Sequence, residues 1–276
     1  MGRPFRQVDV FTATPLLGNP VAVVLDAADL DSATMQAFAR WTNLSETTFV
    51  LPPTSPAADY RVRIFTPSTE LPFAGHPTLG TCHAWLETQP DGASRTHLVQ
   101  ECAAGLVPLR RGPDGLAFAA PPLRRSGPVD PARLPGIATM LGISPDDIVE
   151  AVWADNGPGW IAILLDSAEA VLALRPHDVD GALGVVGPWP TGSTTAFEVR
   201  AFLGQGDATV EDPVTGSLNA AVAQWLLGTG RAQAPYAASQ GAAVHRAGRV
   251  QISTDAEGIV WVAGETITCL SGTVLI

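Results

Sequence analysis

The sequence predicts an α+β protein built from two similar halves. Short β-rich segments are interrupted by single helical segments at irregular intervals, which is typical of α+β folds and not of a doubly wound βαβ sheet. The pattern Glu-x-Pro-x-x-Gly-[His/Ser] occurs at 70–76 and again at 211–217, 141 residues apart in every column. Each copy follows an alternating strand pattern, YRVRIF or FEVRAF, and leads into a helical pattern. We therefore expect a duplicated unit, with a chance likeness of two strand–turn–helix segments as the alternative.

Periodicity, turn residues and helix caps define the elements of the first half. The Gly-Asn-Pro turn at 18–20 separates two strand patterns, and a helical pattern begins after Asp31 or Ser32, both good N-cap residues. The expected strands are 5–12, 20–27, 47–53, 60–66, 95–102, 105–111 and 115–122, and a second helix is expected at 76–88.

The second half repeats this plan after a break in composition. Residues 119–136 are rich in Pro, Gly and Arg and form the expected linker. Gly18 and Gly159, each between two early strands, are also 141 residues apart. The expected strands are 149–156, 159–166, 196–202, 247–254, 258–264 and 265–276, with a short helix near 168–174 and a longer one after the second turn.

Composition excludes several classes of function. The chain has 276 residues, a net charge of −11 and 16 thinly scattered basic residues, whereas a duplex-binding surface needs clustered positive charge. Apolar stretches are too short to span a bilayer and the first residues lack a signal-peptide pattern, so we expect a cytoplasmic protein without nucleic-acid or membrane partners. Three distant cysteines fit no disulfide framework; we expect buried thiols in a reducing compartment, with a catalytic thiol as the alternative.

The two repeated turns are candidate anion-binding sites. A helix N-terminus exposes unpaired N–H groups with partial positive charge, and Gly75 and Gly216 would let a ligand approach the backbone. Such turns can bind a carboxylate or a developing enolate. The alternative is structural: the glycines only form tight turns and Ser217 only caps a helix. If the halves face each other, both helix ends would point into one cleft.

A proton-transfer site also needs a base, and Glu46 is the candidate. It lies among hydroxyl residues at the start of an apolar strand, on the same face as Thr48 and Val50. An inward carboxylate in such surroundings would have a raised pKa and could take and return a proton near neutral pH. A solvent-facing Glu at a strand end is the alternative. Asp212 could be a second acid or a turn residue, and His76 could carry a proton or cap a helix.

These segments together resemble one known family. NLSETTFV (43–50), ELPFAGHPTLGT (70–81) and EDPVTGSLNAAVAQWL (211–226), with an early GNPVAVV and a closing SQG and WVAGETITCLSGT, are similar to the PhzF-like (phenazine biosynthesis) isomerases. The resemblance implies a diaminopimelate-epimerase-like fold: two similar domains, each a curled, barrel-like sheet around a central helix, with the active site in the cleft between them. We expect residues 1–122 with 266–276 in one domain and 123–265 in the other.

The resemblance also implies roles for individual residues. The family's name-giving member isomerises a dihydro-hydroxyanthranilate without metal or cofactor, and Glu46 matches its catalytic carboxylate. A homodimer is expected by the same analogy. The other residues expected in the site are His76, Asp212 and Ser217 for proton movement, Gly75 and Gly216 for the substrate carboxylate, and Asn19, Ser45 and Thr215 as further substrate contacts.

Other chemistries fit less well. Epimerases and racemases of this fold use two thiols, each just before the Gly of its turn, where this chain has Ala74 and Thr215. The chain contains no G-x-x-x-x-G-K-[ST] and no H-E-x-x-H, and its five histidines lack metal-ligand spacing. We therefore expect a cofactor-independent isomerase acting on a small carboxylate. An epimerase or dehydratase using Glu46 and Asp212, and a non-catalytic small-molecule-binding protein, are the alternatives.

Overall fold

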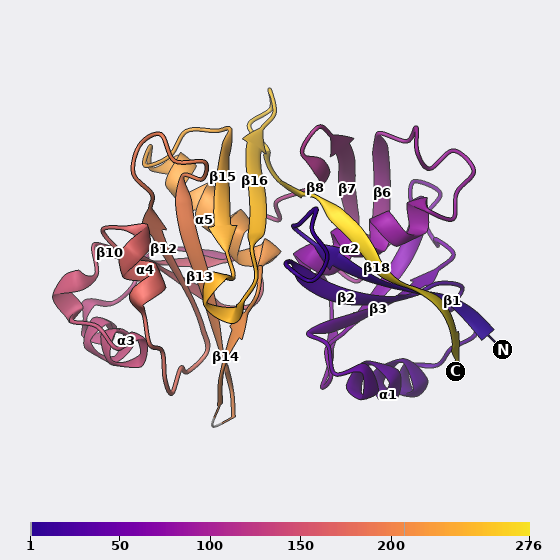
Figure 1. The fold of residues 1–276 in the computed structure, drawn as a ribbon, viewed down its shortest axis with the longest axis horizontal. Helices are drawn as coiled ribbons and strands as arrows, with labels where there is room; N and C mark the ends of the chain where they lie inside the picture. Colours follow the sequence, from indigo (N-terminus) through magenta and orange to yellow (C-terminus); the bar gives the residue numbers. More distant parts are fainter. Residues whose placement is uncertain (1, 207) are drawn as a thin grey trace. The chain divides into compact units, whose positions relative to one another are not determined.

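The computed structural model describes residues 2–206 and 208–276 and divides into two compact units (Figure 1). Unit 1 comprises Met1–Ala119 and Ala263–Ile276, and unit 2 comprises Ala120–Val262. These units change at 119/120 and 262/263, close to the expected domain limits at 122/123 and 265/266. We propose that these two units are two related domains.

Unit 1 is a curved sheet around one helix. Its strands run in the order β18–β1–β2–β3–β4–β6–β7–β8, with β5 paired to the end of β4. Neighbours are antiparallel except β2–β3 and β4–β6, which are parallel. The strands are β1 (Gly2–Val10), β2 (Asn19–Val24), β3 (Glu46–Leu51), β4 (Tyr60–Phe65), β5 (Glu70–Leu71), β6 (His97–Cys102), β7 (Gly105–Gly112), β8 (Gly115–Ala119) and β18 (Thr266–Leu275).

Two helices cover different faces of this sheet. The central helix α2 (Gly75–Leu86) is buried on nearly all sides and contacts β1, β2, β3, β8 and β18, as expected for a helix without a polar face. Helix α1 (Ser32–Thr42) lies outside and packs Met35 and Phe38 against the sheet. Asp31 is its N-cap and accepts a hydrogen bond from the Thr34 backbone N–H at 2.8 Å, which confirms one of the two expected caps.

Unit 2 has the same plan. Its strands run β9–β10–β11–β12–β13–β15–β16, with β14 paired to β13, and the pairs β11–β12 and β13–β15 are parallel. Helix α5 (Gly216–Gly228) is central, while α3 (Leu134–Leu141) and α4 (Ala168–Ala173) pack on the opposite face of the sheet. The strands are β9 (Arg125–Pro128), β10 (Glu150–Asp155), β11 (Trp160–Leu164), β12 (Ala182–Pro188), β13 (Phe197–Gln205), β14 (Ala208–Asp212), β15 (Tyr236–Gln240) and β16 (Gly248–Thr254). Strand β17 (Val260–Gly264) begins in this unit and ends in the residues assigned to unit 1.

The two units repeat each other element by element. In each, an antiparallel pair is followed by a helix and a parallel neighbour (β1, β2, α1, β3 and β10, β11, α4, β12). A hairpin then leads through the Glu-x-Pro turn into the central helix, and the next strand returns parallel to the hairpin's first strand. The predicted α+β class, with a barrel-like sheet around a central helix in each half, is confirmed.

The structure also explains the glutamate of the repeated motif. Glu70 accepts two hydrogen bonds from Arg63, at 2.7 Å each, and Glu211 accepts two from Arg200, at 3.0 and 2.7 Å. Each arginine lies on the first strand of the hairpin that leads to the turn. On that strand it stands two residues ahead of the residue paired with the glutamate. A bidentate Arg–carboxylate pair is geometrically specific. The motif glutamates therefore anchor the turn to the preceding strand.

The expectation of a linker at residues 119–136 was wrong. Residues 119–136 are not a plain linker, because β9 pairs antiparallel with β10, a 3-10 turn follows at Pro131–Arg133, and α3 begins at Leu134. The prolines and glycine of this segment are compatible with an edge strand and with the first turn of a helix. Strands β12 and β15 were also missed; β12 is buried along most of its length and so lacks the alternation that marks a half-buried strand.

Candidate functional site

The N-terminus of α2 carries the first group of candidate residues. Ala74 is the N-cap and provides no side-chain hydrogen bond, and Gly75 and His76 are the first two helical residues. The positive end of the helix dipole and the first backbone N–H groups lie here. Gly75 is not among the residues with positive φ, so its backbone conformation alone does not require glycine. If a ligand approaches the backbone closely at this helix end, as expected, a residue without Cβ leaves room for it at position 75.

Two strand starts bring polar side chains to this helix end. Glu46 begins β3 and Asn19 begins the neighbouring parallel strand β2, so both lie at the same edge of the sheet. Asn19 Nδ2 lies 3.2 Å from His76 Nδ1, and His76 Nε2 lies 3.3 Å from Glu46 Oε2. The Asn19 side chain is fully buried, and the Glu46 side chain is 15% exposed. The imidazole thus joins an amide on one side to a carboxyl group on the other.

The contacts and burial of His76 determine its position and charge. Nδ1 forms a hydrogen bond with Asn19 Nδ2, and Nε2 lies beside the Glu46 carboxyl group. Burial lowers the pKa of His76 from 6.5 to about 3, against a smaller opposing effect of a hydrogen bond with the Pro20 backbone. His76 is therefore neutral near pH 7, and its contact with Glu46 is between a neutral ring and a carboxyl group, not between two full charges.

Because the pKa of His76 is lower in the folded protein, the free energy of unfolding depends on pH. A group whose pKa is lower in the folded state costs stability as pH falls from its unfolded pKa, 6.5, toward its folded pKa, about 3. Between about pH 7 and pH 4.5, wild type should lose about 2–3 kcal/mol more free energy of unfolding than His76→Gln. Urea denaturation of both proteins at the two pH values measures this difference. Equal losses in the two proteins would show that His76 is not buried in its neutral form.

The second group of candidate residues surrounds the N-terminus of α5. Thr215 is the N-cap, and Gly216 and Ser217 are the first helical residues, so the interpretation of Ser217 as the cap was wrong. Asp212, the last residue of β14, accepts a hydrogen bond from Thr215 Oγ1 to Oδ2 at 2.5 Å. The Thr215 hydroxyl thus donates its proton to another residue of the protein. This favours a role in positioning Asp212 over the expected substrate contact.

Gln240, at the end of β15, holds this second group together. Its Oε1 accepts from the Thr215 backbone N–H at 3.0 Å and from Asn219 Nδ2 at 2.8 Å. Its Nε2 donates to Thr215 Oγ1 at 3.0 Å and to the Asp212 carbonyl at 3.1 Å. Gln240 is 1% exposed, so these bonds form away from water and fix the turn against the helix.

Ser217 is also oriented by a neighbour. Its Oγ accepts a hydrogen bond from Trp160 Nε1 at 3.1 Å, and its backbone carbonyl accepts from Asn156 Nδ2 at 2.8 Å. An indole N–H can only donate, so the hydroxyl proton of Ser217 is left to donate elsewhere. Sequence reasoning missed Trp160 as a site residue. The 141-residue offset could have found it, because it relates Trp160 to Asn19 just as it relates Ser217 to His76.

The two groups differ at the position of the carboxylate. In unit 1, Glu46 lies opposite Val21 across the parallel strand pair; in unit 2 the corresponding pair is Ala162 and Gly184. A Cβ on Gly184 would lie 2.2 Å from Leu218 Cδ1, so the side chain of α5 fills this space. Unit 2 therefore has no room for a counterpart of Glu46.

The remaining expected residue, Ser45, directly precedes β3 and is exposed. The structure brings together Asn19, Glu46, Gly75 and His76 within unit 1, and Asp212, Thr215, Gly216 and Ser217 within unit 2.

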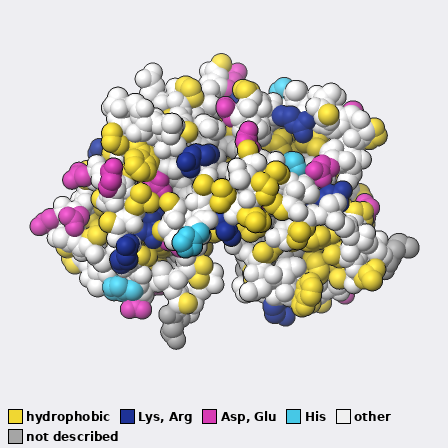
Figure 2. All heavy atoms as spheres, in the orientation of Figure 1, with side chains coloured by type: hydrophobic (Ala, Val, Ile, Leu, Met, Phe, Trp, Pro, Cys, Tyr) yellow, Lys and Arg dark blue, Asp and Glu magenta, His cyan; other side chains and the backbone are white. Residues whose placement is uncertain are grey.

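On the face drawn in Figure 2, basic side chains are dispersed in small separate groups. Among the residues described, no three His, Cys, Asp or Glu side chains are grouped in a way that could hold a metal ion. No helix in the described part of the chain has the length and apolar character needed to cross a membrane.

The cysteines allow a direct test of the catalytic-thiol alternative. Burial raises the pKa of the Cys82 thiol to about 12 and also raises that of Cys102, whereas Cys269 is only half-buried. A protonated, buried thiol is a poor nucleophile. Iodoacetamide at about pH 8 should therefore alkylate Cys269 first and leave the expected isomerase activity intact, as measured by peptide mass spectrometry beside an activity assay. Rapid alkylation of Cys82 with loss of activity would restore the thiol alternative; urea-unfolded protein, with all three thiols reactive, is the control.

Comparison with known proteins now places the chain. The profile of the family described as "Phenazine biosynthesis-like protein" matches residues 8–272. The chain belongs to this family. It is 35% identical to "Antisense-enhancing sequence 1" of Schizosaccharomyces pombe over 97% of each chain. It is 40% identical to a trans-2,3-dihydro-3-hydroxyanthranilate isomerase of Pseudomonas aeruginosa, over 61% of this chain and 59% of that protein.

Solved structures agree on the fold of this phenazine biosynthesis-like protein. A PhzF-family protein of Bacillus anthracis superposes with a TM-score of 0.83, at 24% identity and over 100% of both chains. A hydroxyproline epimerase of Agrobacterium vitis superposes with a TM-score of 0.57 at 14% identity, over 99% of this chain and 92% of that one. These likenesses confirm the epimerase-like fold, and family membership with relatives named isomerases makes the chain an isomerase.

Proposed function

We propose that this isomerase moves a proton between carbons of a small carboxylate substrate, with Glu46 as the acid–base group and without metal or cofactor. The observation that carries the proposal is the contact of Glu46 Oε2 with Nε2 of a buried, neutral His76 at the N-terminus of a helix, 3.3 Å away. A base that takes up and returns a proton needs a fixed position and a nearby group that stabilises each charge state. On this proposal the neutral imidazole of His76 is that nearby group.

The proposed reaction is a proton transfer that returns the enzyme to its starting state. Glu46 takes a proton from a substrate carbon made acidic by conjugation, and the electron pair of the broken C–H bond spreads over the conjugated system. The backbone N–H groups at the start of α2 stabilise the negative charge that develops. Glu46 then gives the proton to a different carbon, the double bonds shift, and no atom is gained or lost.

Asn19 would act as a positioning residue in this scheme. Its hydrogen bond with Nδ1 holds the imidazole in place beside Glu46. Asn19 therefore contributes to the reaction through the orientation of the imidazole.

For unit 2, we propose that the start of α5 binds the substrate carboxylate. The free hydroxyl proton of Ser217 and the backbone N–H groups at Gly216 and Ser217 are suitable donors for an anion. Asp212 is proposed as a second proton carrier, with its carboxyl group oriented by Thr215 and Gln240. We further propose that the enzyme is cytoplasmic and homodimeric.

The named activity of the Pseudomonas aeruginosa relative suggests the first substrate to test. That relative is a trans-2,3-dihydro-3-hydroxyanthranilate isomerase. We propose an unsaturated amino or hydroxy carboxylate of similar size, with this compound as the first member of a panel that also contains common amino acids. Product identity would be determined by NMR and mass spectrometry.

The products separate the competing functions. A shifted double bond at unchanged mass supports the isomerase. Inversion at one carbon would instead indicate an epimerase, and loss of water a dehydratase, each with Glu46 and Asp212 as the acid–base pair. Tight binding without any chemical change would indicate a small-molecule-binding protein and would overturn the proposal.

A further inference from the structure

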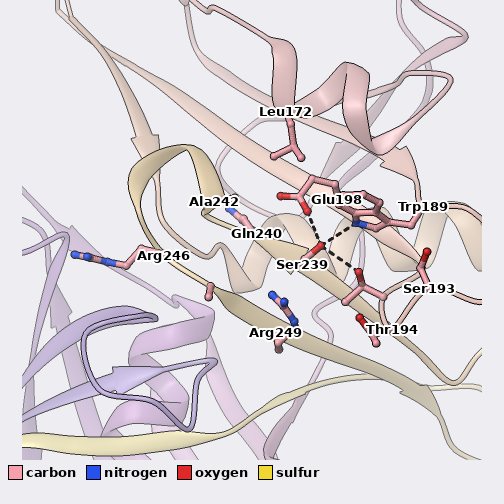
Figure 3. Close-up of a pocket in the computed structure, with 12 residues that line it drawn as sticks. Leu172, Trp189, Ser193, Thr194, Glu198, Ser239, Gln240, Ala242, Arg246 and Arg249 are labelled. Atoms are coloured by element: carbon pink, nitrogen blue, oxygen red, sulfur yellow. Dashed lines mark hydrogen bonds between the residues drawn. The ribbon is translucent and has the colours of Figure 1, made fainter.

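A cavity of about 480 Å³ lies in unit 2, apart from the face of the sheet that packs on α5. Phe197 and Val199 of β13 point into the core around α5, so Glu198 between them points to the opposite face. The cavity opens on that face, beside the connection from β12 to β13 (Figure 3). Its main walls are Leu172, Trp189, Thr195, Glu198, Ser239 and Arg249.

Glu198 is an unusual residue for a cavity wall, because it is a carboxyl group that is 2% exposed. Its Oε2 accepts a hydrogen bond from Ser239 Oγ at 2.5 Å. Its Oε1 is buried and has no hydrogen-bond partner among the described residues. A buried carboxyl oxygen without a partner costs free energy that a bound donor would recover.

The surroundings of Glu198 hold it in place. Ser239 Oγ accepts from Trp189 Nε1 at 3.1 Å and lies 3.3 Å from Thr195 Oγ1, so one hydroxyl links the indole to the carboxyl group. The indole ring is fixed beside the carboxyl group as a result, as Figure 3 shows. Burial raises the pKa of Glu198; hydrogen bonding to Ser239 and Trp189 opposes this shift most, and the positive charge of Arg249 opposes it less.

A positive charge lies across the cavity from the carboxyl group. Arg249 is exposed and, in Figure 3, reaches toward Ser239, whereas Arg246 points away. The cavity therefore has three kinds of wall. The Glu198 carboxyl group lies beside the Trp189 indole, the Arg249 guanidinium lies on another side, and Leu172 provides an apolar side chain. An ammonium group is favoured beside a carboxylate and an indole, and a carboxylate is favoured by a guanidinium.

We propose that this cavity is a second small-molecule site that binds a free amino acid. Its ammonium group donates to Glu198 Oε1 beside Trp189, its carboxylate pairs with Arg249, and its side chain packs toward Leu172. The site does not depend on the proposed isomerase reaction. Gln240 lies between the cavity and α5. It lines the cavity, and it accepts a hydrogen bond from the backbone N–H of Thr215, the N-cap of α5.

The test is calorimetric titration of the full chain with each common L-amino acid, beside its N-acetyl and amide derivatives. We expect at least one amino acid to bind, and both derivatives to bind at least tenfold more weakly because each lacks one charge. Glu198→Gln should weaken binding at least tenfold. Arg249→Gln, at an exposed position, should do the same without endangering the fold, and thermal unfolding checks that each variant is folded.

Glu46→Gln distinguishes this cavity from the proposed active site. An amino acid that binds in the cavity should bind this variant as it binds wild type. Binding that is lost in Glu46→Gln and unchanged in Glu198→Gln and Arg249→Gln would overturn the proposal and assign the ligand to the proposed active site. Absence of binding by every amino acid would also overturn it.

Discussion

Glu46→Gln is expected to lower the turnover of the isomerase by about 10²–10⁴-fold. Glutamine has nearly the same shape, so the contact with His76 Nε2 can persist, but an amide cannot take up and return a proton at neutral pH. Substrate binding should change little, because the proposed anion-binding groups are helix N–H groups and Ser217. Steady-state kinetics gives the turnover, and titration with substrate gives the affinity.

Glu70→Gln is the matched control for this prediction. Glu70 is a second carboxylate of unit 1, but it is bound by Arg63 and anchors the turn before α2. We expect turnover within about tenfold of wild type, because no proton is transferred there. Equal losses in Glu46→Gln and Glu70→Gln would show that the Glu46 effect is structural. Full turnover in Glu46→Gln would contradict the proposed mechanism.

Arg200→Gln is expected to lower the free energy of unfolding by about 3–5 kcal/mol. The Arg200 and Glu211 side chains are only 5% and 12% exposed, so removal of the guanidinium leaves a carboxylate buried without its partner. Arg200 Nη1 also donates to the backbone carbonyls of Val171 and Leu174, at 3.1 and 3.0 Å, and these acceptors would lose their donor. Urea denaturation of both proteins measures the loss.

The repeat provides the control, Arg63→Gln. Arg63 makes the same bidentate contact with Glu70, but the two side chains are 25% and 37% exposed and water can replace the lost partner. We expect a loss of about 1 kcal/mol or less. Similar losses for both substitutions would mean that burial does not separate the two pairs. The comparison therefore measures how much the burial of the Arg–Glu pair contributes to the free energy of unfolding.

The sequence predicted the fold class and the candidate residues because both depend on local signals. The repeated turn shows in the spacing of a few residues, and the Glu46 segment stands out as a carboxylate among hydroxyls at a strand start. Gln240 could not be found in this way. Its role depends on a hydrogen bond to a residue 25 positions away, which only the folded chain brings close to it. Trp160 could be found only through the 141-residue offset, because its hydrogen bond reaches a residue 57 positions away.

The same limit explains the errors in secondary structure. Strand β9 is short and contains proline and glycine, so it looks like a loop until its pairing with β10 is known. The lack of space for a counterpart of Glu46 at Gly184 in unit 2 is also a consequence of tertiary packing. It follows from the register of β12 and from Leu218 filling the space beside Gly184, neither of which can be read from composition.

The most direct test of the proposed proton transfer is NMR in D₂O, with wild type and Glu46→Gln run on the substrate found in the panel. Wild type should shift the double bond or place deuterium at a substrate carbon, and Glu46→Gln should do neither while still binding the substrate. The same exchange and conversion at the wild-type rate in Glu46→Gln would contradict the assignment of Glu46 as the acid–base group.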